Sequence, residues 1–181
     1  MPVTEVTERR GLVTFKGAPQ TLSGQGLAVG DRAPDFTVVS PGLEPVRFSS
    51  FRGRVCVIVS VPSLDTPVCD KEAQRFNAEA ERWGSGVQVL VVSRDLPFAQ
   101  KRWCGAQKDT KIQTASDYKE GEFGRRYGVI WKETGLLGRA VFVVDREGAI
   151  RYIQVVKEIA SEPNYNEVIS AVQGLRGAGV K

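Results

Sequence analysis

The chain has 181 residues, of which 41% are hydrophobic and 25% are charged, so it is long enough for one buried core and too apolar for general disorder. Its formal net charge of +4 comes from scattered basic residues rather than a basic stripe, which argues against nucleic-acid binding. Histidine is absent, which excludes Ser-His-Asp triads, Cys-His proteases and imidazole zinc sites, so any nucleophile must be activated by another group.

The N-terminal residues predict a polar extension followed by a hairpin. Residues 1–10 carry charge but lack the apolar core of a signal peptide, and we expect them to form a flexible extension. Residues 11–22 place two short strands around a turn at Gly17, which predicts an N-terminal β-hairpin. No stretch approaches the roughly 18 consecutive apolar residues of a membrane span. We therefore expect a cytoplasmic protein that does not bind a membrane.

Two near-continuous apolar runs, at 55–61 and 87–93, predict strands that are covered on both faces of a sheet. Between them, apolar residues recur at helical spacing from Ala73 to Trp83. This spacing predicts a helix over 68–83 that lies on the sheet. A strand, a helix and a second strand in this order make a right-handed βαβ unit with parallel strands.

The second half of the chain predicts a helix, a hairpin and a closing helix. Asp95 is a good N-cap for a helix that ends near Cys104, and we interpret it as a cap rather than a catalytic acid. Apolar runs at 140–144 and 150–155 flank a turn with a glycine, which is typical of a hairpin. With the βαβ unit, this order is similar to the thioredoxin-like fold: a single α/β domain over 1–181, with a central mixed β-sheet flanked by helices.

Three cysteines, Cys56, Cys69 and Cys104, are an odd number and have no close C-x-x-C spacing. This pattern argues against a secreted disulfide framework and against a zinc site, so we expect no metal and no other cofactor. Reactive thiol chemistry and inert burial remain. Cys56 lies within an apolar run, so we interpret it as a buried, inert thiol.

The segment from Pro62 to Cys69 carries the strongest chemical signal. It follows the first central strand and leads into the first long helix, which is where open sheets place their sites. A cysteine in the first helical turn meets free backbone N–H groups and the positive end of the helix dipole, which favour the thiolate. Thr66 is close enough to donate a hydrogen bond to that thiolate and to an oxygen atom of a bound substrate. Pro62 ends the strand and would shield the sulfur from solvent.

At these positions the chain resembles a known family. Pro62, Thr66 and Cys69 stand in the pattern P-x-x-x-T-x-x-C, which resembles the active-site motif of the peroxiredoxin superfamily. The segment 30–36 is similar to the segment that opens its domain. Within the superfamily, residues 95–105 and the N-terminal hairpin resemble the thiol peroxidase (Tpx) subfamily, whose members are atypical 2-Cys peroxiredoxins.

The resemblance implies a role for each matching residue. Cys69 is expected to be the peroxidatic thiolate, with Thr66 and Pro62 around it, and Cys104 the resolving thiol. Arg139 matches the active-site arginine of the family, which would stabilise the thiolate and the charge on the leaving oxygen. The implied enzyme reduces hydrogen peroxide and organic hydroperoxides, forms an intramolecular disulfide, is re-reduced by thioredoxin, and is a homodimer. Since the two cysteines lie on separate helices in this family, we also expect local unwinding.

Two other functions are compatible with a reactive cysteine in this position. In the first, the chain is a non-catalytic redox sensor or binding module, and a disulfide between Cys69 and Cys104 switches a partner surface. In the second, it is a thiol–disulfide oxidoreductase, which is disfavoured because Cys69 has no nearby partner cysteine.

We further expect apolar side chains, including Phe51 and Trp103, to surround the reactive thiol.

Overall fold

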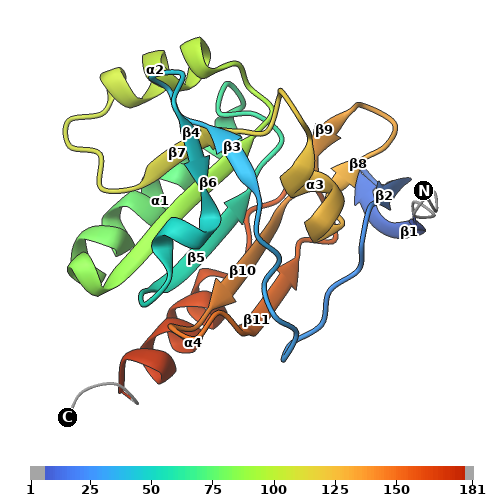
Figure 1. Cartoon of the computed structure of the whole chain (residues 1–181). Coiled ribbons are helices and arrows are strands. Elements are labelled where there is room, and N and C mark those ends of the chain that lie inside the picture. The colour runs from blue at the N-terminus through green and yellow to red at the C-terminus, as the bar shows by residue number, and fades with distance from the viewer. Residues whose placement is uncertain (1–6, 178–181) are drawn as a thin grey trace.

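The computed structural model describes residues 7–177, which form two sheets and four α-helices (Figure 1). The helices are α1 (Pro67–Trp83), α2 (Pro97–Ala106), α3 (Glu122–Tyr127) and α4 (Tyr165–Gly177), with short 3₁₀ turns η1 (Phe48–Phe51) and η2 (Gly84–Gly86). The strands are β1 (Glu8–Phe15), β2 (Ala18–Ser23), β3 (Thr37–Val39), β4 (Pro45–Arg47), β5 (Val55–Ser60), β6 (Val87–Ser93), β7 (Gln113–Ser116), β8 (Ile130–Trp131), β9 (Leu136–Leu137), β10 (Ala140–Val144) and β11 (Ile150–Val155). In the described part of the chain, no helix is long and apolar enough to cross a membrane.

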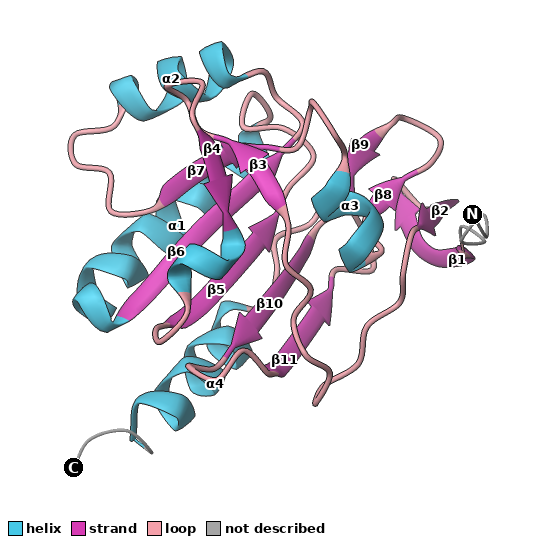
Figure 2. Ribbon diagram, viewed as in Figure 1, coloured by secondary structure: helices cyan, strands magenta, loops and turns pink. Residues whose placement is uncertain are grey.

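The central sheet has seven strands in the order β11-β10-β5-β6-β7-β3-β4. Strands β5, β6 and β7 are parallel, and the other neighbouring pairs are antiparallel. The connection from β5 to β6 runs through α1, so the predicted βαβ unit forms the centre of the fold (Figure 2). The predicted hairpin of β10 and β11 adds to the other edge of β5. The mixed sheet flanked by helices is therefore confirmed.

The apolar runs in the sequence are continuous because each strand faces a core on both sides. On β5, Val57 and Val59 belong to one buried cluster, whereas Cys56 and Ile58 belong to another on the opposite face. The first cluster is covered by α1 and α4 and the second by α3 and η1. In Figure 1, α3 lies in front of the sheet, and α1 and α4 lie behind it. Alternate residues along β5 thus point to different sides of the molecule.

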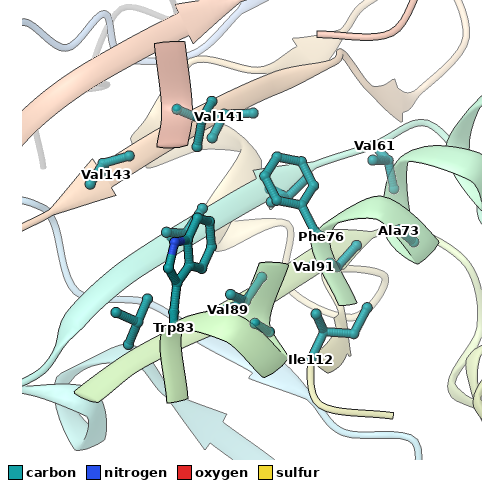
Figure 3. Packing of buried hydrophobic residues seen from close by; sticks show 14 of the residues in the cluster. Val61, Ala73, Phe76, Trp83, Val89, Val91, Ile112, Val141 and Val143 are labelled. Atoms are coloured by element: carbon teal, nitrogen blue, oxygen red, sulfur yellow. The ribbon is translucent and has the colours of Figure 1, made fainter. Parts of the chain in front are cut away.

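The cluster behind the sheet packs α1 against the central strands. Figure 3 shows Phe76 and Trp83 of this helix lying over Val89 and Val141 of the sheet. Cys69, at the start of α1, belongs to the same cluster, as does Trp103 of α2. The position of the reactive segment is therefore fixed by apolar packing along the whole length of α1.

A second, four-stranded sheet joins the N-terminal hairpin to β8 and β9, at the right in Figure 1. The hairpin has its turn at Gly17, as predicted, and the two turn residues, Lys16 and Gly17, have positive φ angles of 50° and 81°. Its first strand, however, begins at Glu8, so our expectation of a flexible extension through residue 10 is wrong for residues 8–10. Residues 8–10 pair with β2 ahead of a register shift between Arg10 and Val13, and residues 1–6 of the expected extension lie outside the described part.

The predicted N-cap of the second helix is also wrong. The cap position of α2 is Leu96, which makes no side-chain cap hydrogen bond, and Pro97 occupies the first turn. The Asp95 carboxylate accepts hydrogen bonds from Ser63 and from the backbone N–H of Leu64 instead. Asp95 therefore ties the segment before α1 to the end of β6.

Candidate active site

The reactive segment begins where β5 ends and α1 starts. Thr66 has an extended backbone (φ −95°, ψ 146°) and is the N-cap of α1, and Pro67 follows it at the first helical position. The backbone N–H of Cys69 donates to the Thr66 hydroxyl over 3.3 Å. Cys69 is therefore in the first turn, as predicted, where free N–H groups and the helix dipole favour negative charge on the sulfur.

The Thr66 hydroxyl is already engaged at both its donor and its acceptor functions. It accepts from the Cys69 N–H, and it donates to the carbonyl oxygen of Ser63 over 3.0 Å. The expected hydrogen bond from Thr66 to the Cys69 sulfur is therefore not made in this structure. A hydroxyl can rotate, but to reach the sulfur or a peroxide it would have to give up its bond to Ser63.

Sheet pairing brings Arg139 to Cys69 from 70 residues away. Strand β10 runs antiparallel to β5 with Ala140 opposite Ser60, so the residue that precedes β10 lies beside the exit of β5. The Ser60 hydroxyl also donates to the carbonyl oxygen of Gly138 over 2.8 Å, which fixes the approach of this segment. The structure thus brings together two residues that the sequence analysis named separately.

The Arg139 guanidinium is buried and uses all three of its nitrogens. Its Nη2 lies 3.3 Å from the Sγ of Cys69, and its Nε donates to the carbonyl oxygen of Ile159 over 2.9 Å. Its Nη1 forms an ion pair with Glu72. Burial, which lowers the pKa of Arg139, is outweighed by the negative charges of Glu72 and Cys69, so that pKa is raised. The guanidinium is held in one orientation with its charge at the sulfur.

Glu72 is a site residue that the sequence analysis missed. It lies on α1 three residues after Cys69, is 0% exposed, and its Oε1 has no hydrogen-bond partner among the described residues. Burial raises the pKa of Glu72 to about 7, although Arg139 opposes the shift. An acidic residue on the same helical face as Ala73 and Phe76 was the signal that could have revealed it, because a carboxylate on an apolar face needs a buried cation.

Cys69 itself is completely buried, with 0% of its surface exposed. Pro62 is two residues beyond the end of β5 and is also buried, which the proposed shielding of the sulfur requires. The sulfur is therefore enclosed by the side chains that surround it in this structure. The segment between Pro62 and Cys69 is held by Asp95, whose carboxylate accepts from Ser63 over 2.6 Å and from Leu64 over 2.8 Å.

Cys104 lies in the last turn of α2 and is partly buried against the same cluster as Cys69. Its Sγ is 3.3 Å from the hydroxyl oxygen of Thr114 on β7. All three cysteines of the chain are free thiols in this structure. The structure therefore describes a state in which Cys69 and Cys104 are on separate helices and are not bonded.

Cys56 lies on the opposite face of the sheet from this site. It belongs to the cluster covered by α3 and η1 and is 1% exposed. Burial raises the pKa of Cys56 to about 12, against a smaller opposing effect of Arg54.

Phe51 packs against the same cluster as Cys56, so our expectation that Phe51 lies near Cys69 is wrong. Trp103, in contrast, is in the cluster of Cys69.

The site places a thiol beside a helix N-terminus and a cation. Among residues 7–177, no three His, Cys, Asp or Glu side chains gather closely enough to hold a metal ion. A buried sulfur at a helix N-terminus, with a guanidinium 3.3 Å away, is arranged to carry negative charge and to stabilise charge on an oxygen that leaves it.

Comparison with known proteins gives consistent matches over most of the chain. The model of the Redoxin family matches residues 28–169. The chain is 47% identical to a thiol peroxidase of Bacillus subtilis over 163 residues, which cover 90% of this chain and 97% of that protein. It is 49% identical to a thiol peroxidase of Oceanobacillus iheyensis over 158 residues, covering 87% and 96%. The crystal structure of a peroxiredoxin-like protein from Aquifex aeolicus is similar with a TM-score of 0.86 and 44% identity, covering 94% of this chain and 98% of that chain.

Proposed function

Because the chain belongs to the thiol peroxidases of the Redoxin family, we propose that Cys69 is its peroxidatic thiolate and Cys104 its resolving thiol. The activity of the family, thiol-dependent reduction of peroxides, is the activity of this chain. The observation that carries the residue assignment is the 3.3 Å contact between Arg139 and the sulfur of Cys69 at the start of α1. Among the described residues, neither Cys56 nor Cys104 has a cation among its hydrogen-bond partners.

In the first step, the Cys69 thiolate attacks the terminal oxygen of a hydroperoxide. The O–O bond breaks, the sulfur is oxidised to a sulfenic acid, and the leaving oxygen takes a proton to become water or an alcohol. Arg139 stabilises the thiolate before the attack and the negative charge that develops on the leaving oxygen during it. Glu72 acts through Arg139, since their ion pair fixes the guanidinium that faces the sulfur.

In the second step, the Cys104 thiol condenses with the sulfenic acid, giving an intramolecular disulfide and releasing water. A disulfide requires Cα atoms about 4.4–6.8 Å apart, and the two thiols lie on α1 and α2 with Cys104 held by Thr114. As the resemblance to the family implies, both helix segments unwind locally to let the two sulfurs meet. A dithiol protein of the thioredoxin type then reduces the disulfide, which restores the two thiols.

We propose a homodimer as the assembled form. Two large apolar side chains at the start of α2 support this proposal: Leu96 is 55% exposed and Phe98 is 66% exposed. Exposed aromatic and aliphatic side chains of this kind favour a protein interface.

We also propose the cytoplasm as the location, because the three free thiols fit a reducing compartment.

The test of the peroxidatic assignment is a matched pair of cysteine variants. Cys69→Ala is expected to abolish the rapid reaction of the reduced protein with hydrogen peroxide in stopped-flow fluorescence, whereas Cys56→Ala is expected to leave its rate within about twofold, since Cys56 is buried on the other face. Turnover with thioredoxin distinguishes the enzyme from a non-catalytic sensor. Rapid peroxide reduction by the Cys69→Ala variant would refute the assignment.

A further inference from the structure

Two contacts join α2 to the start of α1 and to the loop before it, close in sequence to the reactive cysteines. The indole Nε1 of Trp103, which precedes Cys104, donates to the Oδ1 of Asp70, which follows Cys69, over 2.7 Å. Arg102 forms an ion pair with Asp65 over 2.8 Å. The two segments that must unwind before Cys104 can reach Cys69 are therefore connected close to both cysteines.

The two contacts differ in their surroundings. The side chains of Arg102 and Asp65 are 71% and 57% exposed, and exposed ion pairs contribute little. Trp103 is only 7% exposed and packs in the cluster that contains Cys69. Its N–H donates to a carboxylate, which makes a stronger hydrogen bond than one between neutral groups. The other oxygen of Asp70 accepts from Gln74 over 3.0 Å, so the acceptor is held in place.

We propose that the hydrogen bond between Asp70 and Trp103 is a positioning contact that holds Cys104 in its folded place and thereby sets the rate at which Cys104 reaches the oxidised Cys69. This inference rests on the proposed function, in which Cys104 is the resolving thiol. For Cys104 to leave Thr114 and approach α1, the neighbouring Trp103 must leave its cluster and lose its bond to Asp70.

The contact then controls a competition at the Cys69 sulfenic acid. Condensation with the Cys104 thiol forms the S–S bond and releases water. A second hydroperoxide instead oxidises the sulfenic acid to a sulfinic acid and is itself reduced to water or an alcohol. A strong hydrogen bond between Trp103 and Asp70 lengthens the lifetime of the sulfenic acid, and a weak hydrogen bond shortens it. The hydrogen bond therefore tunes the sensitivity of the enzyme to excess peroxide.

The experiment compares three variants in single-turnover reactions with hydrogen peroxide, quenched and analysed by mass spectrometry. Trp103→Phe removes the N–H and keeps an aromatic ring without changing any charge, and Asp70→Asn keeps an acceptor but loses the carboxylate charge. Arg102→Ala, the matched control, breaks only the exposed ion pair between α2 and Asp65 in the loop before α1. Disulfide formation is expected to accelerate about tenfold in Trp103→Phe, which is the scale of one charge-assisted hydrogen bond. The acceleration is expected to be smaller in Asp70→Asn and absent in Arg102→Ala.

Two further readouts separate this role from a general loss of structure. The rate of sulfenic acid formation in Trp103→Phe is expected to stay close to wild type, and the sulfinic acid formed per turnover is expected to fall as resolution accelerates. If disulfide formation in Trp103→Phe and Asp70→Asn keeps the wild-type rate, the positioning role is refuted. If wild type forms no disulfide between Cys69 and Cys104, the proposed function fails instead, so the two failures are distinguishable.

Discussion

Arg139 is the residue that makes Cys69 different from an ordinary buried thiol. Its three nitrogens contact the Cys69 sulfur, Glu72 and the carbonyl oxygen of Ile159. A lysine at this position has one charged nitrogen and cannot make all three contacts, so the charge would leave either the sulfur or the carboxylate. The fixed guanidinium is thus a property of the residue type and not only of its charge.

Replacing Arg139 with lysine should therefore slow the peroxide step. We expect Arg139→Lys to lower the rate constant of Cys69 oxidation about 100-fold, the scale of losing one preorganised donor to the transition state. Stopped-flow measurement with hydrogen peroxide checks this, and Arg151→Lys is the control, because Arg151 pairs with Asp145 at the opposite end of β10 from Arg139. A variant as fast as wild type would show that charge alone is sufficient.

Glu72 makes the site sensitive to pH. Its pKa is raised from 4.5 to about 7 by burial, so between these values the folded protein binds more protons than the unfolded chain. Stability contributed by the protonated carboxyl is consequently present below pH 4.5 and is lost as the pH rises through about 7. We expect urea unfolding to show the stability of wild type, relative to Glu72→Gln, falling from pH 5 to pH 7.5. A constant difference across this range would contradict the raised pKa.

At the level of single residues, the sequence motif revealed the nucleophile but not its ion-pair network. Cys69 and Arg139 were recognisable because they stand in a family pattern, and the structure places them in contact. Glu72 and Asp95 were not, since their roles depend on partners 67 and 32 residues away. Spacing along the chain does not report contacts of that range.

At the level of elements, the start of α1 depends on its cap. Thr66→Ala removes the acceptor for the Cys69 N–H, and the loss of such a cap costs about 1 kcal/mol. Thr66→Ser keeps a hydroxyl and should retain most of that stability. Chemical denaturation of the two variants checks the difference, and equal stabilities for alanine and serine would contradict the capping role.

Asp95 anchors the segment that carries Thr66 and Cys69. As an N-cap it would contribute about 1 kcal/mol and leave the chemistry unchanged. The structure gives it three side-chain contacts instead, to Ser63, to the Leu64 N–H and to Ser93 over 2.7 Å. We expect Asp95→Ala to cost about 3 kcal/mol and also to slow the peroxide step, because buried donors lose a charged acceptor. Denaturation and stopped-flow kinetics measure both effects, and an unchanged rate would restore the simple capping interpretation.

The long elements were predictable, whereas several short ones were not. Runs of apolar residues located β5, β6 and α1 because burial on both faces leaves a strong pattern. Strand β7 reads Gln-Thr-Ala-Ser and is polar, yet it is held by pairing with β6 and by Gln100, whose amide donates to the carbonyl oxygen of Ala115. Helix α3 is six residues long and depends on Asp117, which accepts from two of its N–H groups.

At the level of the whole molecule, the sheet separates two thiol environments. The face covered by α1 and α4 contains Cys69 and, at its margin, Cys104, whereas the other face contains Cys56. The alternation of side chains along β5 and the pairing of β10 with β5 produce this separation. We propose that residues 7–177 fold as one domain, since both clusters share the same central strands.

The measurement that tests the account most directly is the identity of the bond formed after one equivalent of peroxide. The reduced protein is treated with hydrogen peroxide, its remaining thiols are alkylated, and its peptides are mapped by mass spectrometry. We predict a disulfide that joins Cys69 to Cys104, with Cys56 recovered as an alkylated thiol, and a persistent sulfenic acid on Cys69 in the Cys104→Ser variant. A disulfide that includes Cys56, or an unoxidised Cys69, would contradict the proposed roles of the two thiols.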